Sequence, residues 1–199
     1  GVFETVEILR ADTPEGKPGA PAVVARRSAK NGAPTILLYA HHDVQPPGDE
    51  DVWKTPPFQP TVIDGRIYGR GAADDKAGIV AHLTSVRALK AVLGNDFDLG
   101  LTLFIEGEEE AGSPSFRNFL ETYRDRLQAD VIVVADSSNW STTVPAITTT
   151  LRGLVSQVIE VKTLDHAVHS GMYGGVVPDA MTALLRVLAS LHDANGDVA

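Results

Sequence analysis

Cysteine is absent from the 199-residue sequence. Its absence excludes disulfide bonds and thiolate metal sites, so histidine, aspartate and glutamate are left to hold any metal ion. A chain without cysteine fits a reducing compartment, and we expect a cytoplasmic protein. Long apolar runs are missing too, because no segment reaches the length of a membrane span and the N-terminus has no signal-peptide pattern. We therefore expect no association with a membrane.

Positive charge is scarce. Lysine and arginine together number 17 against 26 aspartates and glutamates, which gives a formal net charge of −9. Such an acidic chain is a poor candidate for binding the phosphates of a nucleic acid, so we expect no nucleic-acid partner. The hydrophobic fraction of 43% is ordinary for a globular protein, and the length allows one large or two small domains.

Apolar patterning predicts strands and helices in alternation. Strands are expected at residues 2–9, 22–27, 35–40, 101–105 and 131–135. Asp64-Gly65 predicts a tight hairpin between residues 61–63 and 66–68. Helices are expected at residues 76–92 and 115–127, the second with Ser113 as N-cap and Pro114 at its first position. The first helix has an apolar face made of Ile79, Val80, Leu83, Val86, Leu89 and Val92. This alternation predicts an α/β sheet with helices packed over it.

Acidic and histidine side chains follow the apolar strands. His41 and Asp43 follow one strand, Asp136 follows another, and the stretch EGEEEAGS at residues 106–113 follows a third. Asp74 and Asp75 precede the first helix. By itself the glutamate stretch suits a solvated acidic loop as well as a metal site. In such sheets ligands collect at the carboxyl ends of the strands, and the convergence of these residues favours a metal site.

The predicted cluster has the donors that two closely spaced divalent cations need: His41, Asp43, Asp74, Glu109, Glu110 and Asp136. Asp43 lies two residues after His41 and is placed to orient its imidazole. Of the adjacent Glu109 and Glu110, one can bind metal while the other serves as a general base for a bound water. Spacing alone leaves open which does which. We expect Glu106 and Glu108 to be structural, and His82 and His192 to lie on the surface.

The character of the chain changes near residue 151. A strand at residues 151–161, a glycine-rich turn at 166–175 and an amphipathic helix at 177–191 predict the start of a second domain. We divide the chain into domains at residues 1–150 and 151–199. Because it begins with Gly1 and enters a strand at once, we expect it to be a piece of a longer protein.

Five ordered motifs cover nearly the whole chain: AHHDVQPP, GRGAADDKAG, EGEEEAGS, the strand ending in Asp136, and HSGMYGG. In this order they resemble the dinuclear metallopeptidases related to carnosinase, a family that includes acetylornithine deacetylase, succinyl-diaminopimelate desuccinylase and the aminoacylases. The resemblance implies a catalytic domain with a mixed sheet flanked by helices, followed by an α+β lid that forms homodimers. It also implies two divalent metal ions, zinc or manganese with cobalt as an alternative.

The resemblance assigns roles to single residues. His41 and Asp136 would hold one ion and Glu110 the other. Asp74 would bridge both ions, and the peptide bond between Asp74 and Asp75 would be cis. Glu109 would be the general base. His169 would reach a neighbouring subunit's site and polarise the substrate carbonyl.

The sequence departs from the family pattern at a few positions. Ala40 stands where the family commonly has glycine, and His42 stands where its dipeptidases often have tyrosine. Ala167 stands where the family often has an aspartate, two residues before the histidine of the HSG motif. The family's C-terminal histidine ligand has no counterpart. We therefore expect this chain to be inactive alone and to bind metal mainly at the His41, Asp74 and Asp136 site.

Three functions remain open. Gln45 in DVQP and Asp75-Lys76 in DDK resemble the dipeptidase branch, which favours hydrolysis of the amide bond in dipeptides or short peptides. The alternatives are a deacylase or desuccinylase acting on acylated amino acids with the same metal chemistry, and a non-catalytic module whose lid mediates assembly.

Overall fold

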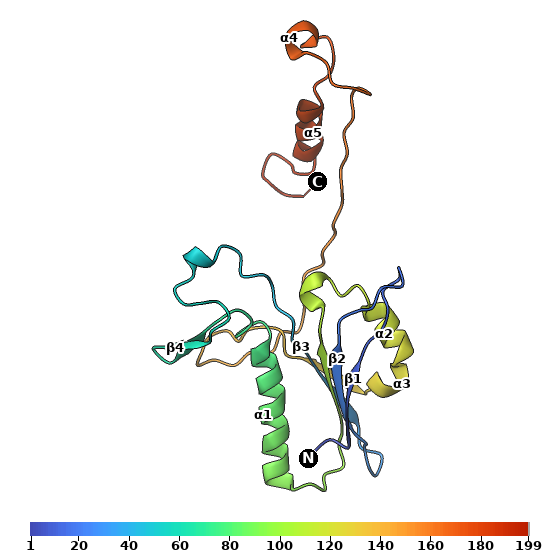
Figure 1. Ribbon diagram of the computed structural model, residues 1–199, viewed down its shortest axis with the longest axis vertical. Helices are drawn as coiled ribbons and strands as arrows, with labels where there is room; N and C mark the ends of the chain where they lie inside the picture. Colours follow the sequence, from blue (N-terminus) through green and yellow to red (C-terminus); the bar gives the residue numbers. More distant parts are fainter. Residues whose placement is uncertain (199) are drawn as a thin grey trace. The chain divides into compact units, whose positions relative to one another are not determined.

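The computed structural model describes residues 1–198, and the chain divides into two compact units, Gly1–Thr148 and Thr149–Ala199 (Figure 1). The assignment of residues 1–150 to a catalytic domain and of 151–199 to the start of a lid stays a prediction.

The first unit contains a mixed five-stranded sheet in the order β1-β2-β6-β3-β7. The strands are β1 (Thr5–Leu9), β2 (Ala22–Arg27), β3 (Thr35–His41), β6 (Gly100–Glu106) and β7 (Val131–Val134). β2 runs antiparallel to β1 and to β6, whereas β3 runs parallel to both β6 and β7. The carboxyl ends of β6, β3 and β7 therefore lie at one edge of the sheet.

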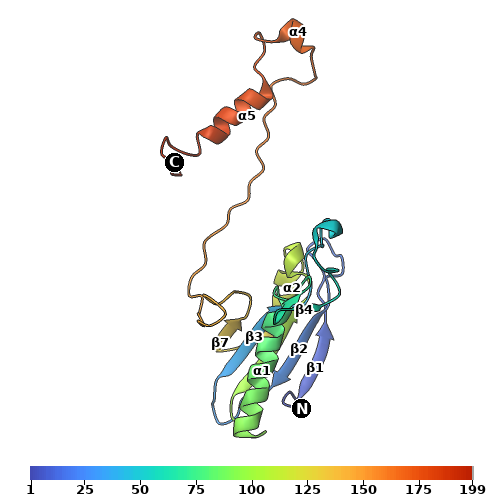
Figure 2. The ribbon, with the colours of Figure 1, turned by 90° about the vertical axis from the view of Figure 1, so that its left-hand side faces the viewer.

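Helices cover both faces of this sheet, as Figure 2 shows for α1 (Lys76–Leu93). Ile79, Leu83 and Val86 of α1 pack on one face, against a core that includes Leu38, Leu101 and Leu103. On the other face lie α2 (Phe116–Thr122) and α3 (Arg124–Leu127), whose Phe119 and Leu127 pack with Val24, Leu37 and Phe104. The predicted mixed sheet flanked by helices is confirmed. Two residues assigned to the apolar face of α1, Val80 and Val92, are instead exposed.

Local signals set several element ends. Asp64 and Gly65 both have positive φ, 49° and 74°, which a two-residue turn of this kind requires, and they join β4 (Thr61–Ile63) to β5 (Arg66–Tyr68). Asp75 caps α1 by accepting a hydrogen bond from the backbone N–H of Gly78 at 3.2 Å. The proline-rich loop before the hairpin holds only a short 3-10 helix, η1 (Glu50–Val52).

The helix predicted at residues 115–127 is broken in two, and its predicted N-cap is wrong. Ser113 has a φ of 50° and lies in a turn, so Ser115 is the N-cap of α2. α2 ends at Thr122, and Tyr123 follows with its hydroxyl donating to the Arg10 carbonyl at 2.8 Å. A tertiary contact at this aromatic residue thus accompanies the break between α2 and α3.

β7 was predicted as a buried strand, but its side chains are exposed. Val131, Ile132, Val133 and Val134 keep between 42% and 63% of their surface accessible. β7 is the last strand of the sheet and pairs only with β3 in the part of the chain that the structure describes. An apolar strand at a sheet edge is covered only when another segment packs on it.

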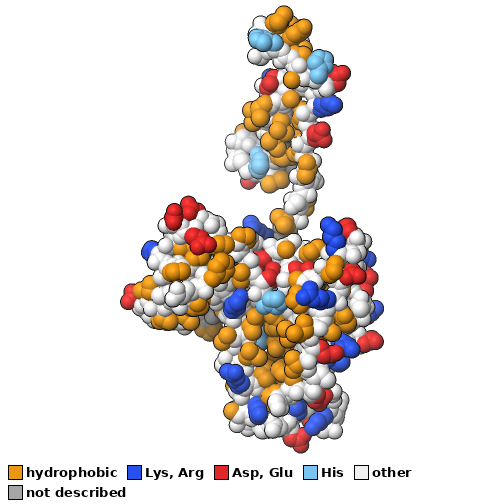
Figure 3. Space-filling view, viewed as in Figure 1, with side chains coloured by type: hydrophobic (Ala, Val, Ile, Leu, Met, Phe, Trp, Pro, Cys, Tyr) orange, Lys and Arg blue, Asp and Glu red, His pale blue; other side chains and the backbone are white. Residues whose placement is uncertain are grey.

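The second unit has little regular structure. Residues 151–161 were predicted as a strand, but they form no ladder with any described residue. Two helices follow, α4 (Ser170–Tyr173) and α5 (Ala180–Ala189), so part of the predicted glycine-rich turn is helical. Apolar side chains around α5 are exposed, among them Met181, Leu185 and Leu188 (Figure 3). Within residues 1–198, no helix combines the length and apolar character that crossing a membrane needs.

Candidate metal centre

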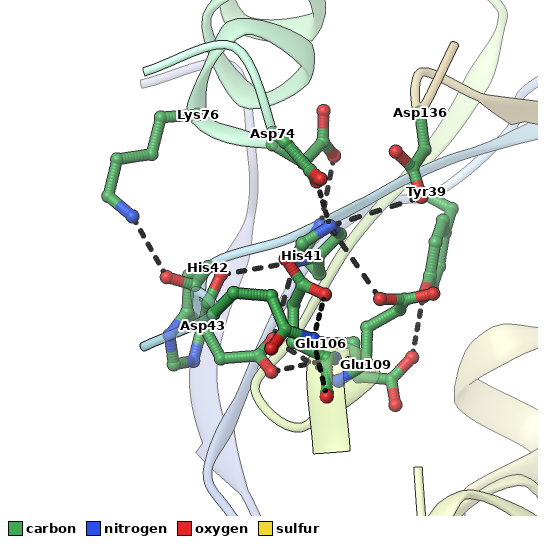
Figure 4. Close-up of polar contacts among 12 residues, drawn as sticks. Tyr39, His41, His42, Asp43, Asp74, Lys76, Glu106, Glu109 and Asp136 are labelled. Atoms are coloured by element: carbon green, nitrogen blue, oxygen red, sulfur yellow. Dashed lines mark hydrogen bonds and ion pairs between the residues drawn. The ribbon is translucent and has the colours of Figure 1, made fainter. Parts of the chain in front are cut away.

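Three side chains meet at the carboxyl edge of the parallel strands. His41 is the last residue of β3, Asp136 follows the end of β7, and Asp74 precedes α1. One donor atom from each lies within 4.8 Å of the other two. The His41 Nε2 atom is 3.0 Å from Asp74 Oδ1 and 3.9 Å from Asp136 Oδ2 (Figure 4). One imidazole nitrogen and two carboxylates form a donor set that suits zinc, manganese or cobalt.

His41 is held with its Nε2 atom facing the two carboxylates. The imidazole is fully buried, and its Nδ1 atom lies 3.2 Å from the carbonyl oxygen and 3.3 Å from the carboxylate of Asp43. Both of these oxygens accept hydrogen bonds and so favour the tautomer with its proton on Nδ1, although Nε2 also faces an acceptor, Asp74 Oδ1 at 3.0 Å. That tautomer is the one a metal ligand needs.

Asp75 connects His41 to the start of α1. Its carboxylate is 2% exposed and accepts hydrogen bonds from the backbone N–H groups of His41, at 3.1 Å, and of Gly78. Burial raises the pKa of Asp75 above its usual value. The Asp74-Asp75 peptide bond is cis, as the family resemblance implies.

Gly78 allows α1 to approach the end of β7 closely. A Cβ atom at this position would lie 2.0 Å from the carbonyl oxygen of Ala135, the residue before Asp136. A larger side chain would therefore push the helix and the Asp136 segment apart. The glycine of the DDKAG motif thus brings two of the three donor-bearing segments together.

Glu109 and Glu110 begin a single turn, η2 (Glu109–Ala111), that follows β6. The Asp43 carboxylate accepts hydrogen bonds from both of their backbone N–H groups, at 3.2 and 2.9 Å. The Glu109 Oε2 atom lies 3.9 Å from His41 Nε2. Glu110 is outside the group of three donors, and its carboxylate accepts a hydrogen bond from Gln45. Asp43 therefore positions the glutamate turn as well as the imidazole.

The electrostatics of the centre are those of crowded carboxylates. Burial acts to lower the pKa of His41, but the surrounding carboxylates, Asp136 first, outweigh it and the pKa is raised. The pKa of Glu109 is raised, chiefly by burial. His41 acts to lower it, and the neighbouring carboxylates of Asp136, Glu110 and Glu106 raise it further. A carboxylate whose pKa is shifted upward is better matched to accepting a proton near neutral pH. A concentration of negative charge of this kind is stabilised by bound cations.

Sequence reasoning missed a contact beside the centre between Tyr39 and Glu106. The Tyr39 hydroxyl donates to Glu106 Oε2 at 2.6 Å, and Glu106 is 3% exposed (Figure 4). Burial, followed by this hydrogen bond, raises the pKa of Tyr39. The available signal was the two-residue strand period, because Tyr39 and His41 lie on the same side of β3.

His82 was expected on the surface but is buried. Only 4% of its surface is accessible, and its Nε2 atom donates to the backbone carbonyl of Tyr39 at 2.8 Å. The same carbonyl accepts a hydrogen bond from the N–H of Ala135 at 3.1 Å. His82 therefore connects α1 to the Tyr39 carbonyl, where β3 meets the end of β7. Tyr39 lies two residues before His41 in the sequence.

Glu108 is structural, as expected. It is 8% exposed, and its carboxylate accepts hydrogen bonds from the backbone N–H groups of Ala20, at 2.9 Å, and Ser115, at 2.6 Å, and from the Ser115 hydroxyl. Burial raises the pKa of Glu108, but these three hydrogen bonds outweigh it and the pKa is lowered. The side chain therefore connects the glutamate turn to the start of α2.

We expect Glu108→Gln to lower the free energy of unfolding by about 1–3 kcal/mol. The amide offers one acceptor oxygen where the carboxylate offers two, so a buried N–H donor would face the new NH₂ group. Urea denaturation measures the effect. Glu50→Gln, at an exposed position in η1, is the matched control and should change stability by less than about 0.5 kcal/mol. Equal stability of the two variants would contradict this structural role.

The remaining predicted site residue, His169, belongs to the second unit. It is the N-cap of α4, where its Nδ1 atom accepts a hydrogen bond from the backbone N–H of Gly171 at 3.1 Å. Its role towards a substrate stays a prediction. His192 lies on the surface of this unit, as expected.

Comparison with known proteins identifies the family. The pattern of Peptidase family M20/M25/M40 matches residues 37–196. The chain belongs to this peptidase family. The M20 pattern begins in β3, four residues before His41, and extends into the second unit, so it covers every site residue predicted from the sequence.

Individual M20 relatives are dipeptidases. The chain is 39% identical over 178 residues to the cysteinylglycine-S-conjugate dipeptidase of Corynebacterium striatum, covering 89% of this chain and 39% of that protein. It is 37% identical over 198 residues to the human beta-Ala-His dipeptidase, covering 98% of this chain and 39% of that protein. The chain thus spans about two fifths of the length of these curated relatives.

Solved structures show the same M20 fold. Human carnosine dipeptidase 1 matches with a TM-score of 0.61 and 30% identity, over 97% of this chain and 42% of that one. An M20 metallo-carboxypeptidase from Sulfolobus solfataricus matches with a TM-score of 0.69 and 28% identity, again over 97% and 42%.

Proposed function

We propose that the protein is a metal-dependent dipeptidase. The observation that carries this proposal is the meeting of His41, Asp74 and Asp136 at one edge of the sheet, with the Glu109 carboxylate 3.9 Å from the His41 Nε2 atom. The names of its M20 relatives support a dipeptide as the substrate class.

The residues present fit a pair of divalent cations. His41, Asp136 and Asp74 would hold one ion, and Asp74 and Glu110 the other, each through nitrogen or oxygen donors that suit zinc, manganese or cobalt. Bound there, the cations would lower the pKa of a water molecule and polarise the amide carbonyl of the substrate.

Glu109 is the general base in this proposal. Its carboxylate is beside the donor group, is not one of the three clustered donors, and has a raised pKa. It takes a proton from the attacking water, so that the water oxygen bonds to the amide carbon. Glu109 then donates this proton to the leaving amine as the carbon–nitrogen bond breaks. Asp43 keeps Glu109 in place through its backbone N–H.

A second candidate, a deacylase acting on N-acylated amino acids, would need the same cations and base. The relatives favour a dipeptide substrate, and so do the DVQP and DDK motifs of the first unit. Lys76 of the DDK motif donates from its ammonium group to the backbone carbonyl of His42 at 3.0 Å, which connects the helix start to the loop after β3.

His169 is assigned to polarising the substrate carbonyl, from the second unit of a partner in a homodimer. The exposed apolar side chains of α5 suit such an association.

Turnover of a substrate panel tests this proposal in the full-length protein. Dipeptides such as Cys-Gly and β-Ala-His should be hydrolysed in the presence of zinc or manganese, and chelation should abolish the activity. N-acetylated and N-succinylated amino acids form the comparison set. Faster turnover of the acylated set would favour the deacylase. No turnover of either set with any of the three metals would leave only the non-catalytic assembly module.

A further inference from the structure

One exposed side chain contacts Glu110 twice. The Gln45 Nε2 atom donates to the Glu110 carboxylate oxygen Oε2 at 2.7 Å and to the Glu110 backbone carbonyl at 3.1 Å. Both of these oxygens only accept hydrogen bonds, so the amide has to present its nitrogen to them. The contact therefore fixes the orientation of the Gln45 amide as well as that of Glu110.

Gln45 and Asp43 act on Glu110 from the same segment. Asp43 accepts the hydrogen bond of the Glu110 backbone N–H at 2.9 Å, and Gln45 donates to its backbone carbonyl. Both polar groups of the Glu110 backbone are thus held by the loop that follows β3. The side chain is held as well, through Oε2, which leaves Oε1 as the carboxylate oxygen that Gln45 does not contact.

We propose that Gln45 is a positioning residue that orients Glu110, so that this carboxylate offers one oxygen, Oε1, to the second cation. The inference rests on the proposed function, in which Glu110 is a ligand. Without the amide, the carboxylate would rotate about its side-chain bonds and have to be ordered again when the ion binds. Hydrogen-bond partners of metal ligands typically change metal affinity by about 10–100-fold when they are removed.

Gln45 is exposed, so its contribution to the stability of the fold should be small. This separates a positioning role from a structural one. Removing the amide should weaken binding of the second ion while leaving both the melting temperature and binding at the His41, Asp74 and Asp136 site unchanged.

Metal titration of the full-length protein tests the proposal. Gln45→Met keeps the length of the side chain but has no donor, and Gln45→Asn keeps an amide that is one methylene too short. Gln59→Met, at an exposed position in the same proline-rich loop, is the matched control. Calorimetric titration with Mn²⁺ gives the affinity of each site, and thermal denaturation of the metal-free proteins gives their stability.

Both Gln45 variants should bind the second ion about 10–100-fold more weakly, with the first site and the melting temperature unchanged. Their activity should return at high Mn²⁺ concentration. If the wild-type protein binds two ions and hydrolyses dipeptides while the Gln45 variants bind the second ion within twofold of wild type, the role of Gln45 is wrong and the proposed function stands. If the wild-type protein binds no second ion, both are overturned.

Discussion

Glu109→Gln should reduce kcat by a factor of about 10²–10⁴ in the full-length protein while its metal content stays the same. The glutamine amide has the shape of the carboxylate but cannot take a proton from water at neutral pH. Glu109 is not one of the three clustered donors, so its replacement should spare metal binding. The change should therefore appear in kcat, measured with a dipeptide, and not in the metal-to-protein ratio.

Glu121→Gln removes a carboxylate from an exposed position on α2, where it pairs with the exposed Arg117, and should leave kcat unchanged. A Glu109→Gln variant that keeps wild-type kcat would show that another group is the base. A variant that loses its metal would instead make Glu109 a ligand.

The sheet could be predicted where local and tertiary preferences agree. β2, β3, α1 and the β4–β5 hairpin lie at or within one residue of their predicted bounds. Each has an apolar pattern or a strong end signal, such as Asp75 before α1 or Asp64-Gly65 in the hairpin. In these segments the local signals and the tertiary packing favour the same structure.

Predictions failed where the outcome depends on a distant partner. Residues 151–161 need a neighbouring segment to pair with before they can form a strand, and no described residue supplies one. The apolar run of β7 predicted burial, but burial depends on what packs against the sheet edge. His82 lies on the helix with a polar side chain, and only the approach of the Tyr39 carbonyl explains why it is buried.

The candidate site shows the same division. Polar residues at two strand ends and before the first helix predicted the meeting of His41, Asp74 and Asp136, because parallel strands bring their carboxyl ends to one edge. The hydrogen bonds that support the site depend on loop conformation, and spacing does not encode them. Asp43 was expected among the metal donors and as the residue that orients the imidazole, but not as the acceptor of hydrogen bonds from the backbone N–H groups of Glu109 and Glu110.

Asp136→Asn should weaken binding of the first metal ion by more than about 100-fold. Removing a hydrogen-bond partner of a ligand already costs about 10–100-fold, and loss of a charged ligand should cost more. An asparagine keeps the shape of the side chain, so β7 and its pairing with β3 should survive. Calorimetric titration of the chain with Zn²⁺ or Mn²⁺ measures the affinity, and far-ultraviolet circular dichroism checks the fold.

Asp125→Asn is the matched control, because it removes an equal charge from an exposed position on α3. It should leave metal affinity within about twofold of wild type, since physiological salt weakens the interactions of solvent-exposed charges. If both variants weaken binding equally, the acidic character of the whole chain attracts the ion and Asp136 is not a ligand. If only Asp136→Asn does so, the segment that follows β7 supplies a ligand. The position of Asp136 then depends on the β3–β7 pairing and on the close approach of α1 at Gly78.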